Sequence, residues 1–323
     1  MRPVARLIAL LAGCCVFVAA ANAQQYPSRA VKFLVPQAPA GATDVFARKV
    51  GQMLSEKWGQ PVVVENRAGA AGVVGTDIVA KAPADGYTLL VTYAGSQAIN
   101  PSLYANLPFD SIKAFQTVAT VARTPFFLIA NPRLPAKNLR DFVALARSKP
   151  DAYTFASSGN GSVNHLLGEM LKAEAGIKIL HVPYRGVAEA ITDVMAGHVD
   201  TAFSSVPSVL AIVRGGQVRA LAVSSANRVA VAPEVPTVAE SGYPGFDVDP
   251  WWGILAPAGT DMAIVGKINS DVRDVLQTQE MVDFLATQGA EPFITTPDGF
   301  AAILTSDVAM WAKVVKAANV KIN

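Results

Sequence analysis

The sequence predicts an α/β protein made of two units, each built around a mostly parallel sheet with helices beside it. Two observations lead to this fold class. Short β-branched runs alternate with longer amphipathic segments from residue 31 onward, and the same rhythm restarts at residue 126. The length of 323 residues also fits two domains, since ~150 residues per domain is common. We expect ligands at the loops that follow the carboxyl ends of the strands.

The first unit follows a β-α-β-α-β order. Strands are predicted at 32–36, 61–65 and 87–93, because each is a short apolar run bounded by turn-forming residues. A helix is predicted at 45–58, where apolar side chains recur at helical spacing, and another begins at 76. This order predicts a parallel arrangement with helices on both faces.

The second unit repeats this alternation. Strands are predicted at 126–130, 154–156, 179–182, 200–203 and 220–224, and helices at 139–148, 163–175, 188–196 and 206–214. After a proline-rich passage, a strand is expected at 252–256 and helices at 264–276, 279–287 and 297–318.

The two units are expected to share a close, multi-strand hinge, because no internal repeat or low-complexity linker separates them. The predicted lobe 1 combines residues 24–124 and 225–323, and the predicted lobe 2 covers 125–224. The return crossover between 220 and 252 is the least defined boundary.

Residues 1–23 predict a secretory signal peptide. Arg2 and Arg6 precede an uncharged run at 7–21, and Ala21-Asn22-Ala23 forms a small-x-small cleavage site. The run of 15 residues is shorter than the ~20 apolar residues that a membrane-spanning helix needs. The mature protein is therefore expected to be exported and to begin after Ala23.

Both cysteines, Cys14 and Cys15, lie within this signal segment. A lipoprotein cleavage that leaves a lipidated Cys14 is the alternative to cleavage after Ala23. Cleavage after Ala23 would leave a mature protein without a cysteine, and hence without a disulfide, a thiol nucleophile or a thiolate metal site.

The charge balance excludes several classes of protein. Residues 24–323 contain 25 basic and 25 acidic side chains, and this zero net charge disfavours nucleic-acid binding. The charged fraction of 16% and the apolar fraction of 51% exclude a disordered chain. No heptad pattern persists, so a coiled coil is also excluded.

Loop 1 (residues 36–44) follows the first predicted strand and has the sequence PQAPAGATD. Small residues let a ligand approach the backbone closely, and free amides at a helix start suit a carboxylate or a phosphate. Thr43 or Asp44 can cap the helix, and we assign Asp44 to capping because its charge disfavours a bound anion. A tight turn with a routine cap is the alternative.

Loop 2 (residues 157–162, SSGNGS) precedes the helix predicted at 163–175. Three serines, an asparagine and two glycines at a helix start provide a dense set of donors for an anion. The loop contains no Lys or Arg, which favours a carboxylate over a multiply charged phosphate. The alternative is a capped loop without a ligand.

Several other motifs argue against cofactors and catalysis. Residues 67–75 contain Gly69, Gly72 and Gly75, which do not match the spacing of a dinucleotide or phosphate-binding loop; close helix packing is the simpler explanation. The chain has no G-x-S-x-G elbow, which disfavours a serine hydrolase.

The three histidines match no zinc motif. His165 lies in the first turn after loop 2, where it could touch a ligand. His181 precedes a strand end, where a structural hydrogen bond is expected, and His198 lies in an exposed turn.

Two further features lie near strand ends. Arg185, in Tyr184-Arg185-Gly186, is either a partner for a ligand carboxylate or a surface charge. Trp251 and Trp252 either close over a ligand or pack in the core.

Together these loops make the chain resemble the periplasmic solute receptors of tripartite tricarboxylate transporters, called Bug proteins. The resemblance covers essentially the whole mature chain and rests on the combination of short stretches at 26–28, 39–48, 59–67, 85–90, 99–104, 157–165, 181–186, 219–223, 235–240 and 256–260.

This resemblance implies a two-lobed, type II periplasmic-binding fold that closes around a small organic ligand. It implies that backbone amides of loop 1 hold a ligand carboxylate, partly through ordered waters, and that loop 2 adds contacts. It further implies a periplasmic location, a monomer, docking to two integral membrane components, and neither a cofactor nor catalysis.

The predicted ligand-binding residues combine both loops with neighbouring strand ends. No catalytic or metal-binding residue is predicted. The set is Pro39, Ala40, Gly41, Ala42, Thr43, Tyr93, Ser96, Ser158, Asn160, Gly161, Ser162, His165, Tyr184, Gly186, Ser204 and Ser205.

Departures from the family pattern bear on specificity. Gly41-Ala42 stands where Gly-Gly is frequent, Gln97 where a histidine is common, and Ser204-Ser205 where Asp-Asn is frequent. The missing acidic residue leads us to expect a ligand without an amino group, such as a mono- or dicarboxylate, aromatic ones included. A ligand-sensing module for a membrane sensor and an exported hydrolase are the alternative functions.

Overall fold

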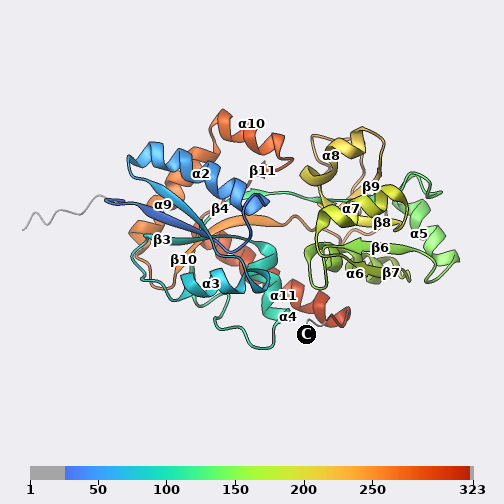
Figure 1. Ribbon diagram of the computed structural model, residues 1–323, viewed down its shortest axis with the longest axis horizontal. Helices are drawn as coiled ribbons and strands as arrows, with labels where there is room; N and C mark the ends of the chain where they lie inside the picture. Colours follow the sequence, from blue (N-terminus) through green and yellow to red (C-terminus); the bar gives the residue numbers. More distant parts are fainter. Residues whose placement is uncertain (1–25, 321–323) are drawn as a thin grey trace, which may run out of the picture.

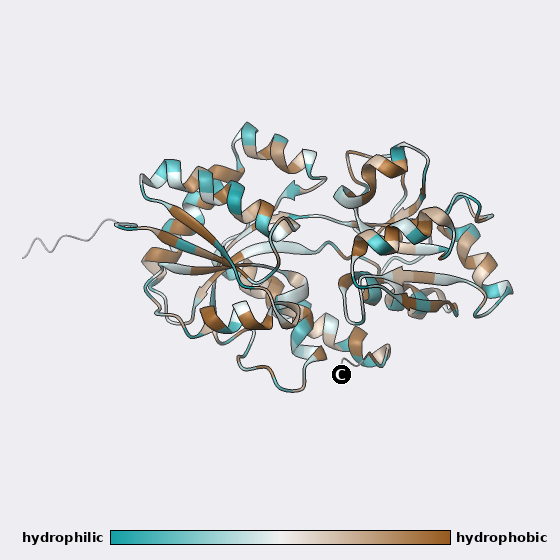
Figure 2. Cartoon of the chain, viewed as in Figure 1, coloured by the Kyte–Doolittle hydropathy of each residue, from teal (hydrophilic) through white to brown (hydrophobic). Residues whose placement is uncertain are grey.

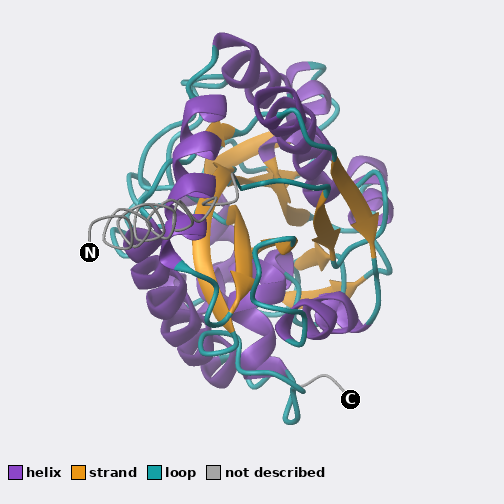
Figure 3. Ribbon diagram, turned by 90° about the vertical axis from the view of Figure 1, so that its left-hand side faces the viewer, coloured by secondary structure: helices purple, strands orange, loops and turns teal. Residues whose placement is uncertain are grey.

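The computed structural model describes residues 26–320, which form two α/β lobes lying side by side (Figure 1). Helices flank the sheet of each lobe (Figure 3), which confirms the predicted α/β fold class. The predicted signal peptide and both cysteines lie outside the described residues. Within residues 26–320, every helix is too short or too polar to span a membrane.

Lobe 1 contains a six-stranded sheet in the order β11-β4-β10-β3-β1-β2. β1 runs parallel to β2 and β3, whereas β10 runs antiparallel to β3 and β4, so the sheet is mixed. The strands are β1 (Val31–Val35), β2 (Val62–Asn66), β3 (Thr88–Tyr93), β4 (Phe115–Arg123), β10 (Trp251–Pro257) and β11 (Glu291–Pro292). The helices are α2 (Ala42–Trp58), η1 (Ala70–Gly72), α3 (Val73–Ala80), the π-helical η2 (Gly95–Ile99), α4 (Asn100–Leu103), α9 (Met262–Leu276), α10 (Gln279–Thr287) and α11 (Pro297–Ala317).

Different helices cover the two faces of this sheet. α2, α9 and α10 pack on the face that carries Phe33 and Val91, and α3 and α11 cover the face that carries Leu34 and Leu90. Figure 2 shows largely apolar strands in the sheet of lobe 1 and helices that carry both hydrophilic and hydrophobic residues. Alternate residues of β1 thus enter different cores, as expected for a strand buried on both faces.

Lobe 2 contains a five-stranded sheet in the order β7-β6-β8-β5-β9. β6 runs parallel to β7 and β8, and β5 runs antiparallel to β8 and β9. The strands are β5 (Phe126–Ala130), β6 (Thr154–Ser157), β7 (Leu180–Pro183), β8 (Thr201–Ser205) and β9 (Arg219–Val223). The helices are α5 (Leu139–Ser148), α6 (Val163–Ala175), α7 (Val187–Ala196) and α8 (Val206–Arg214).

The sequence pattern does not predict β4, although it is the longest strand of its sheet. Gln116, Thr117 and Thr120 interrupt its apolar residues, so it lacks a continuous apolar run. The structure buries this polar face by pairing hydroxyls with distant backbone: Thr117 donates to the Pro297 carbonyl at 2.9 Å, and Thr120 donates to the Phe293 carbonyl at 2.6 Å. When buried hydroxyls form their hydrogen bonds with residues far away in the sequence, no local sequence pattern indicates that the strand is buried.

The hinge consists of two crossovers that lie against each other, one from β4 to β5 and one from β9 to β10. The Thr124 amide donates to the Pro250 carbonyl at 3.2 Å. The Ser224 hydroxyl donates to the Val248 carbonyl at 2.6 Å and accepts from the Phe126 amide at 2.9 Å. These bonds tie together the two strands that pass between the lobes.

Residues 226–248 pack on lobe 2 before the chain returns to β10. Val229, Ala232 and Val235 belong to the apolar core of lobe 2, and the Val238 amide donates to the Val223 carbonyl at 2.9 Å. The predicted boundary between residues 224 and 225 stays a prediction, and this packing favours a later return at about 248–250.

Candidate functional site

Loop 1 joins β1 to α2 and is open to solvent along most of its length. Pro39, Ala40, Gly41 and Ala42 are exposed. α2 begins at Ala42 after an N-cap glycine that offers no side-chain cap. A helix start leaves its first amides without intrahelical acceptors, so the amides of the exposed residues Gly41 and Ala42 are available to an anion, whereas Thr43 is buried.

Asp44 supports loop 1 from beneath. Its buried carboxylate accepts hydrogen bonds from the Ala40 amide at 2.9 Å, from Asn66 Nδ2 at 2.9 Å and from Arg48 Nε at 3.0 Å. Burial alone would raise the pKa of Asp44, but these hydrogen bonds outweigh that effect and lower the pKa. Asp44 therefore occupies the Ala40 amide that was expected to face a ligand.

Ala40 adopts a left-handed backbone conformation, with φ at 65°. That conformation costs an L-residue about 1–2 kcal/mol, so the surrounding contacts must enforce it. The bond from the Ala40 amide to Asp44 is one such contact. Enforced strain of this kind is concentrated at binding and catalytic sites, which agrees with a functional loop 1.

Thr43 and Trp252 lie in the core beneath loop 1, whereas Trp251 belongs to the core on the opposite face of the sheet. Trp252 Nε1 donates to Thr43 Oγ1 at 3.0 Å, and the Trp252 ring lies 6.1 Å from Tyr93 in a stacked arrangement. Trp251 Nε1 donates to Asp307 at 2.8 Å. Trp251 and Trp252 are 1% and 6% exposed, so in this structure both pack in the core.

Ser96 cross-links the strand-end loops of lobe 1. Its hydroxyl accepts from Gln37 Nε2 at 2.8 Å and donates to the Ala71 carbonyl at 3.0 Å. A Cβ at Gly72 would lie 2.7 Å from Ser96 Oγ, so only glycine fits there. The glycines at 69–75 thus serve close packing, and the buried Ser96 hydroxyl holds loop 1 rather than facing solvent.

Loop 2 satisfies most of its own polar groups. Ser162 Oγ donates to the Gly159 carbonyl at 2.7 Å and accepts from the His165 amide at 3.3 Å, which caps α6. Ser158 Oγ donates to Asn164 Oδ1 at 2.9 Å. The Asn160 side chain, by contrast, is exposed. Among the predicted donors of this loop, Asn160 is the one that faces solvent.

His165 and His181 stack beneath loop 2. Their ring centroids are 3.8 Å apart with an interplanar angle of 12°, and Phe155 stacks on His181 at 4.9 Å. His181 Nε2 bonds to Ser157 Oγ at 2.6 Å, which confirms the expected structural hydrogen bond. Burial, followed by the charges of His165 and Lys172, lowers the pKa of His181 to about 3.

Ser157 and His181 do not form the core of a hydrolytic site. Ser157 is 1% exposed, and His181 faces another imidazole ring rather than a carboxylate that could orient it. Among residues 26–320, no group of three or more His, Cys, Asp or Glu side chains could hold a metal ion.

Of the remaining predicted residues, Tyr184 and Ser205 have local side-chain partners. Tyr184 donates to Asp193 Oδ2 at 2.6 Å, and burial together with this bond raises the pKa of Tyr184 to about 12. Ser205 Oγ bonds to Ser208 Oγ at 2.7 Å. Gly186 is the N-cap of α7, and the Ser204 hydroxyl is buried without a hydrogen-bond partner among the described residues. Arg185 is exposed, which agrees with both of its alternatives, and His198 is exposed, as expected for a residue in a surface turn.

A contact between Leu103 and Gly161 joins the lobes next to loop 2. A Cβ at Gly161 would lie 2.5 Å from Leu103 Cδ1, so the α4 side chain of lobe 1 rests directly on the loop 2 backbone. α11 of lobe 1 also contacts α6 of lobe 2. Sequence reasoning missed Leu103, because a leucine in a short loop helix carries no signal of a cross-lobe contact.

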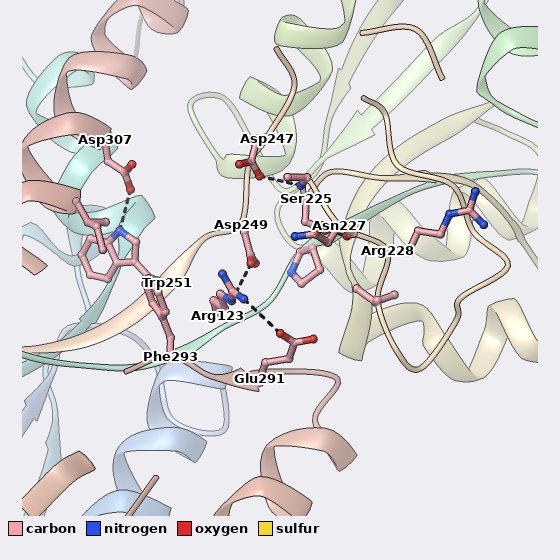
Figure 4. A pocket seen from close by; sticks show the side chains of 14 residues that line it. Arg123, Ser225, Asn227, Arg228, Asp247, Asp249, Trp251, Glu291, Phe293 and Asp307 are labelled. Atoms are coloured by element: carbon pink, nitrogen blue, oxygen red, sulfur yellow. Dashed lines mark hydrogen bonds and ion pairs between the residues drawn. The ribbon is translucent and has the colours of Figure 1, made fainter. Parts of the chain in front are cut away.

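A separate cavity of about 260 Å³ lies at the hinge (Figure 4). Arg123 at the end of β4 lies 3.3 Å from Asp249 in the crossover from β9 to β10 and 3.6 Å from Glu291. Burial raises the pKa of Asp249 to about 7, against the opposing effect of Arg123. None of the predicted ligand-binding residues lines this cavity.

Comparison with known proteins gives one consistent family. The family described as "Tripartite tricarboxylate transporter family receptor" matches residues 46–320. Protein BugT of Bordetella pertussis is 38% identical over 98% of both chains.

Two solved structures from Rhodopseudomonas palustris resemble the whole fold. Rpa4515 with adipate has 34% identity and a TM-score of 0.81, covering 92% of this chain and 100% of that chain. MatC with bound malate has 31% identity and a TM-score of 0.77, covering 90% and 100%.

Proposed function

Because the chain belongs to the tripartite tricarboxylate transporter receptor family, we propose that it captures an amine-free organic carboxylate, of which dicarboxylates are the best candidates. The proposal includes export to the periplasm through a signal peptide cleaved after Ala23. It also includes delivery of the solute, by a monomeric receptor, to two integral membrane components. Receptors of this family bind solutes and are not enzymes.

The observation that carries the proposal is the construction of loop 1. Amides at the start of α2 are exposed and available, while the carboxylate of Asp44 beneath them is paired with Arg48 and hydrogen-bonded to Asn66. A carboxylate can therefore be held by amides and the helix dipole, while the nearby Arg48 is already paired with Asp44.

The choice of ligand class has two supports. Relatives whose structures contain adipate and malate bind dicarboxylates that lack an amino group. In this chain Ser204 and Ser205 replace an acidic position that could pair with an amine. A serine hydroxyl binds the ammonium group of a ligand more weakly than a carboxylate does, because the hydroxyl carries no negative charge.

The test is thermal unfolding of the mature protein with single organic acids, followed by calorimetric titration. Adipate, malate and benzoate are compared with aspartate and glutamate. A bound acid at 100-fold its Kd should stabilise the protein by about 2.7 kcal/mol and be recovered unchanged. Tight binding of only aspartate or glutamate would contradict the ligand class. Consumption of a stabilising acid would indicate an enzyme instead.

A further inference from the structure

We propose that His165 is a positioning residue, whose unprotonated Nδ1 holds the tip of loop 2 in the conformation used for ligand capture and makes that capture sensitive to acid. The ligand part of this inference rests on the proposed function. The part that concerns loop 2 does not. This role replaces the expected direct contact between His165 and a ligand.

The geometry shows His165 holding loop 2 at two points. Its ring Nδ1 accepts the Gly161 amide at 3.0 Å, and its own amide donates to Ser162 Oγ at 3.3 Å. Gly161 is buried with φ at 77°, a conformation that the bond to His165 helps to fix. The tip of the loop therefore depends on a ring nitrogen that can accept a hydrogen bond.

Gly161 is also where loop 2 meets the other lobe. Leu103 lies against the backbone of Gly161, on the side where a Cβ would project. The loop tip is thus held between His165 of its own lobe and Leu103 of lobe 1. A displacement of the tip would disturb both the loop 2 donors and the contact between the lobes.

The charged groups around His165 set its protonation state. Burial lowers its pKa from the usual value of 6.5; Glu169 opposes this shift and Lys172 adds to it. Glu169 lies 3.7 Å from Nε2 but is paired with Lys172 at 2.8 Å, and His181 stacks on the ring. Lys313 of α11 lines the same α6–α11 groove as Glu169.

Protonation would replace the acceptor at Nδ1 with a donor that faces the Gly161 N–H. Because the pKa of His165 is lower in the folded state than in the unfolded state, its contribution to stability is complete above pH 6.5. That contribution is lost as the pH falls from 6.5 toward the folded value. Acid should therefore release the loop tip, and solute affinity should fall with it.

The experiment measures hydrogen exchange at the Gly161 amide by NMR, as a protection factor, from about pH 7.5 to about pH 4.5. His165→Leu removes the acceptor. His165→Asn places an amide oxygen near the position of Nδ1 and does not titrate. His198→Asn is the matched control, because His198 is an exposed histidine beside Asp193. Adipate and malate affinities are measured by calorimetry on the same samples.

The proposal expects protection at Gly161 in the wild type to fall on acidification, and His165→Leu to lose about tenfold at neutral pH. His165→Asn should restore protection and remove its pH dependence, and His198→Asn should behave as the wild type. Affinities for adipate and malate should follow the same order.

Full protection in His165→Leu, or an unchanged pH profile in His165→Asn, would overturn the proposal. If His165→Leu does not fold, the pH profile of His165→Asn decides alone. If the wild type binds neither acid, the ligand class fails, while the exchange data still decide the role of His165.

Discussion

Loop 1 and loop 2 both follow parallel strands and precede helices, but their hydrogen bonds are arranged in opposite ways. In loop 1, a single buried carboxylate, Asp44, holds the chain from below and leaves the helix-start amides exposed. In loop 2, the hydroxyls of Ser158 and Ser162 bond within the loop and α6, and His165 holds the tip.

This difference shows that the hydrogen-bond donors expected from the residue types of a loop are not the donors that the folded loop leaves free for a ligand. Loop 2 is richer in polar side chains, yet most of them satisfy the loop itself. Loop 1 has few polar side chains, yet its backbone amides are open. We therefore expect loop 1 to supply most of the carboxylate binding and loop 2 to supply shape and a small number of polar contacts.

The largest expected effect tests the dependence of loop 1 on Asp44. Asp44→Ala removes the acceptor for the Ala40 amide, Asn66 and Arg48, and should cost about 2–4 kcal/mol in the free energy of unfolding. Urea denaturation measures it. Glu56→Ala on the same helix is the control, because Glu56 is exposed and bonds only to Gln52 among the described residues. That control should change stability by less than ~0.5 kcal/mol. An equal loss in the free energy of unfolding of the two variants would mean that Asp44 does not stabilise the conformation of loop 1.

A matched pair of glycine substitutions compares the loops directly. Gly161→Ala places a Cβ at φ 77° and 2.5 Å from Leu103, and should destabilise the protein by about 1–3 kcal/mol. Gly41→Ala has an ordinary φ of −76° and a nearest contact of 3.6 Å. It should cost only about 0.5 kcal/mol, from the weaker N-cap preference of alanine. Urea unfolding of both proteins gives the comparison, and a larger loss in Gly41→Ala would reverse it.

The sequence predicts the fold class and the positions of both loops, because buried strands are short apolar runs and ligand loops follow their carboxyl ends. It does not predict which donors remain free. That outcome depends on the left-handed conformation of Ala40 and on the contact between Asn66 of β2 and Asp44 of α2. Neither fact has a local sequence signal.

The hinge cavity shows the same limit more strongly. Arg123, Asp249 and Glu291 come from three distant segments and meet only after both crossovers have formed. The sequence pattern also fails to predict β4, which ends at Arg123, because polar residues interrupt the apolar residues of this buried strand. The periodicity of a sequence does not predict which polar groups from distant segments pair in the folded protein.

The smallest expected effect on stability gives the sharpest test of loop 2. Asn160→Ala should leave the free energy of unfolding within ~0.5 kcal/mol of the wild type, since the side chain is exposed. If Asn160 is the free donor of loop 2, carboxylate affinity should fall by about 0.5–1.5 kcal/mol in calorimetry.

Ser162→Ala should show the reverse pattern, because the Ser162 hydroxyl caps α6. We expect the free energy of unfolding to fall by about 1 kcal/mol and the affinity to change less than in Asn160→Ala. A loss of affinity in Ser162→Ala that exceeds the loss in Asn160→Ala would mean that loop 2 binds solute through its capping serine, and the contrast between the two loops would then be wrong.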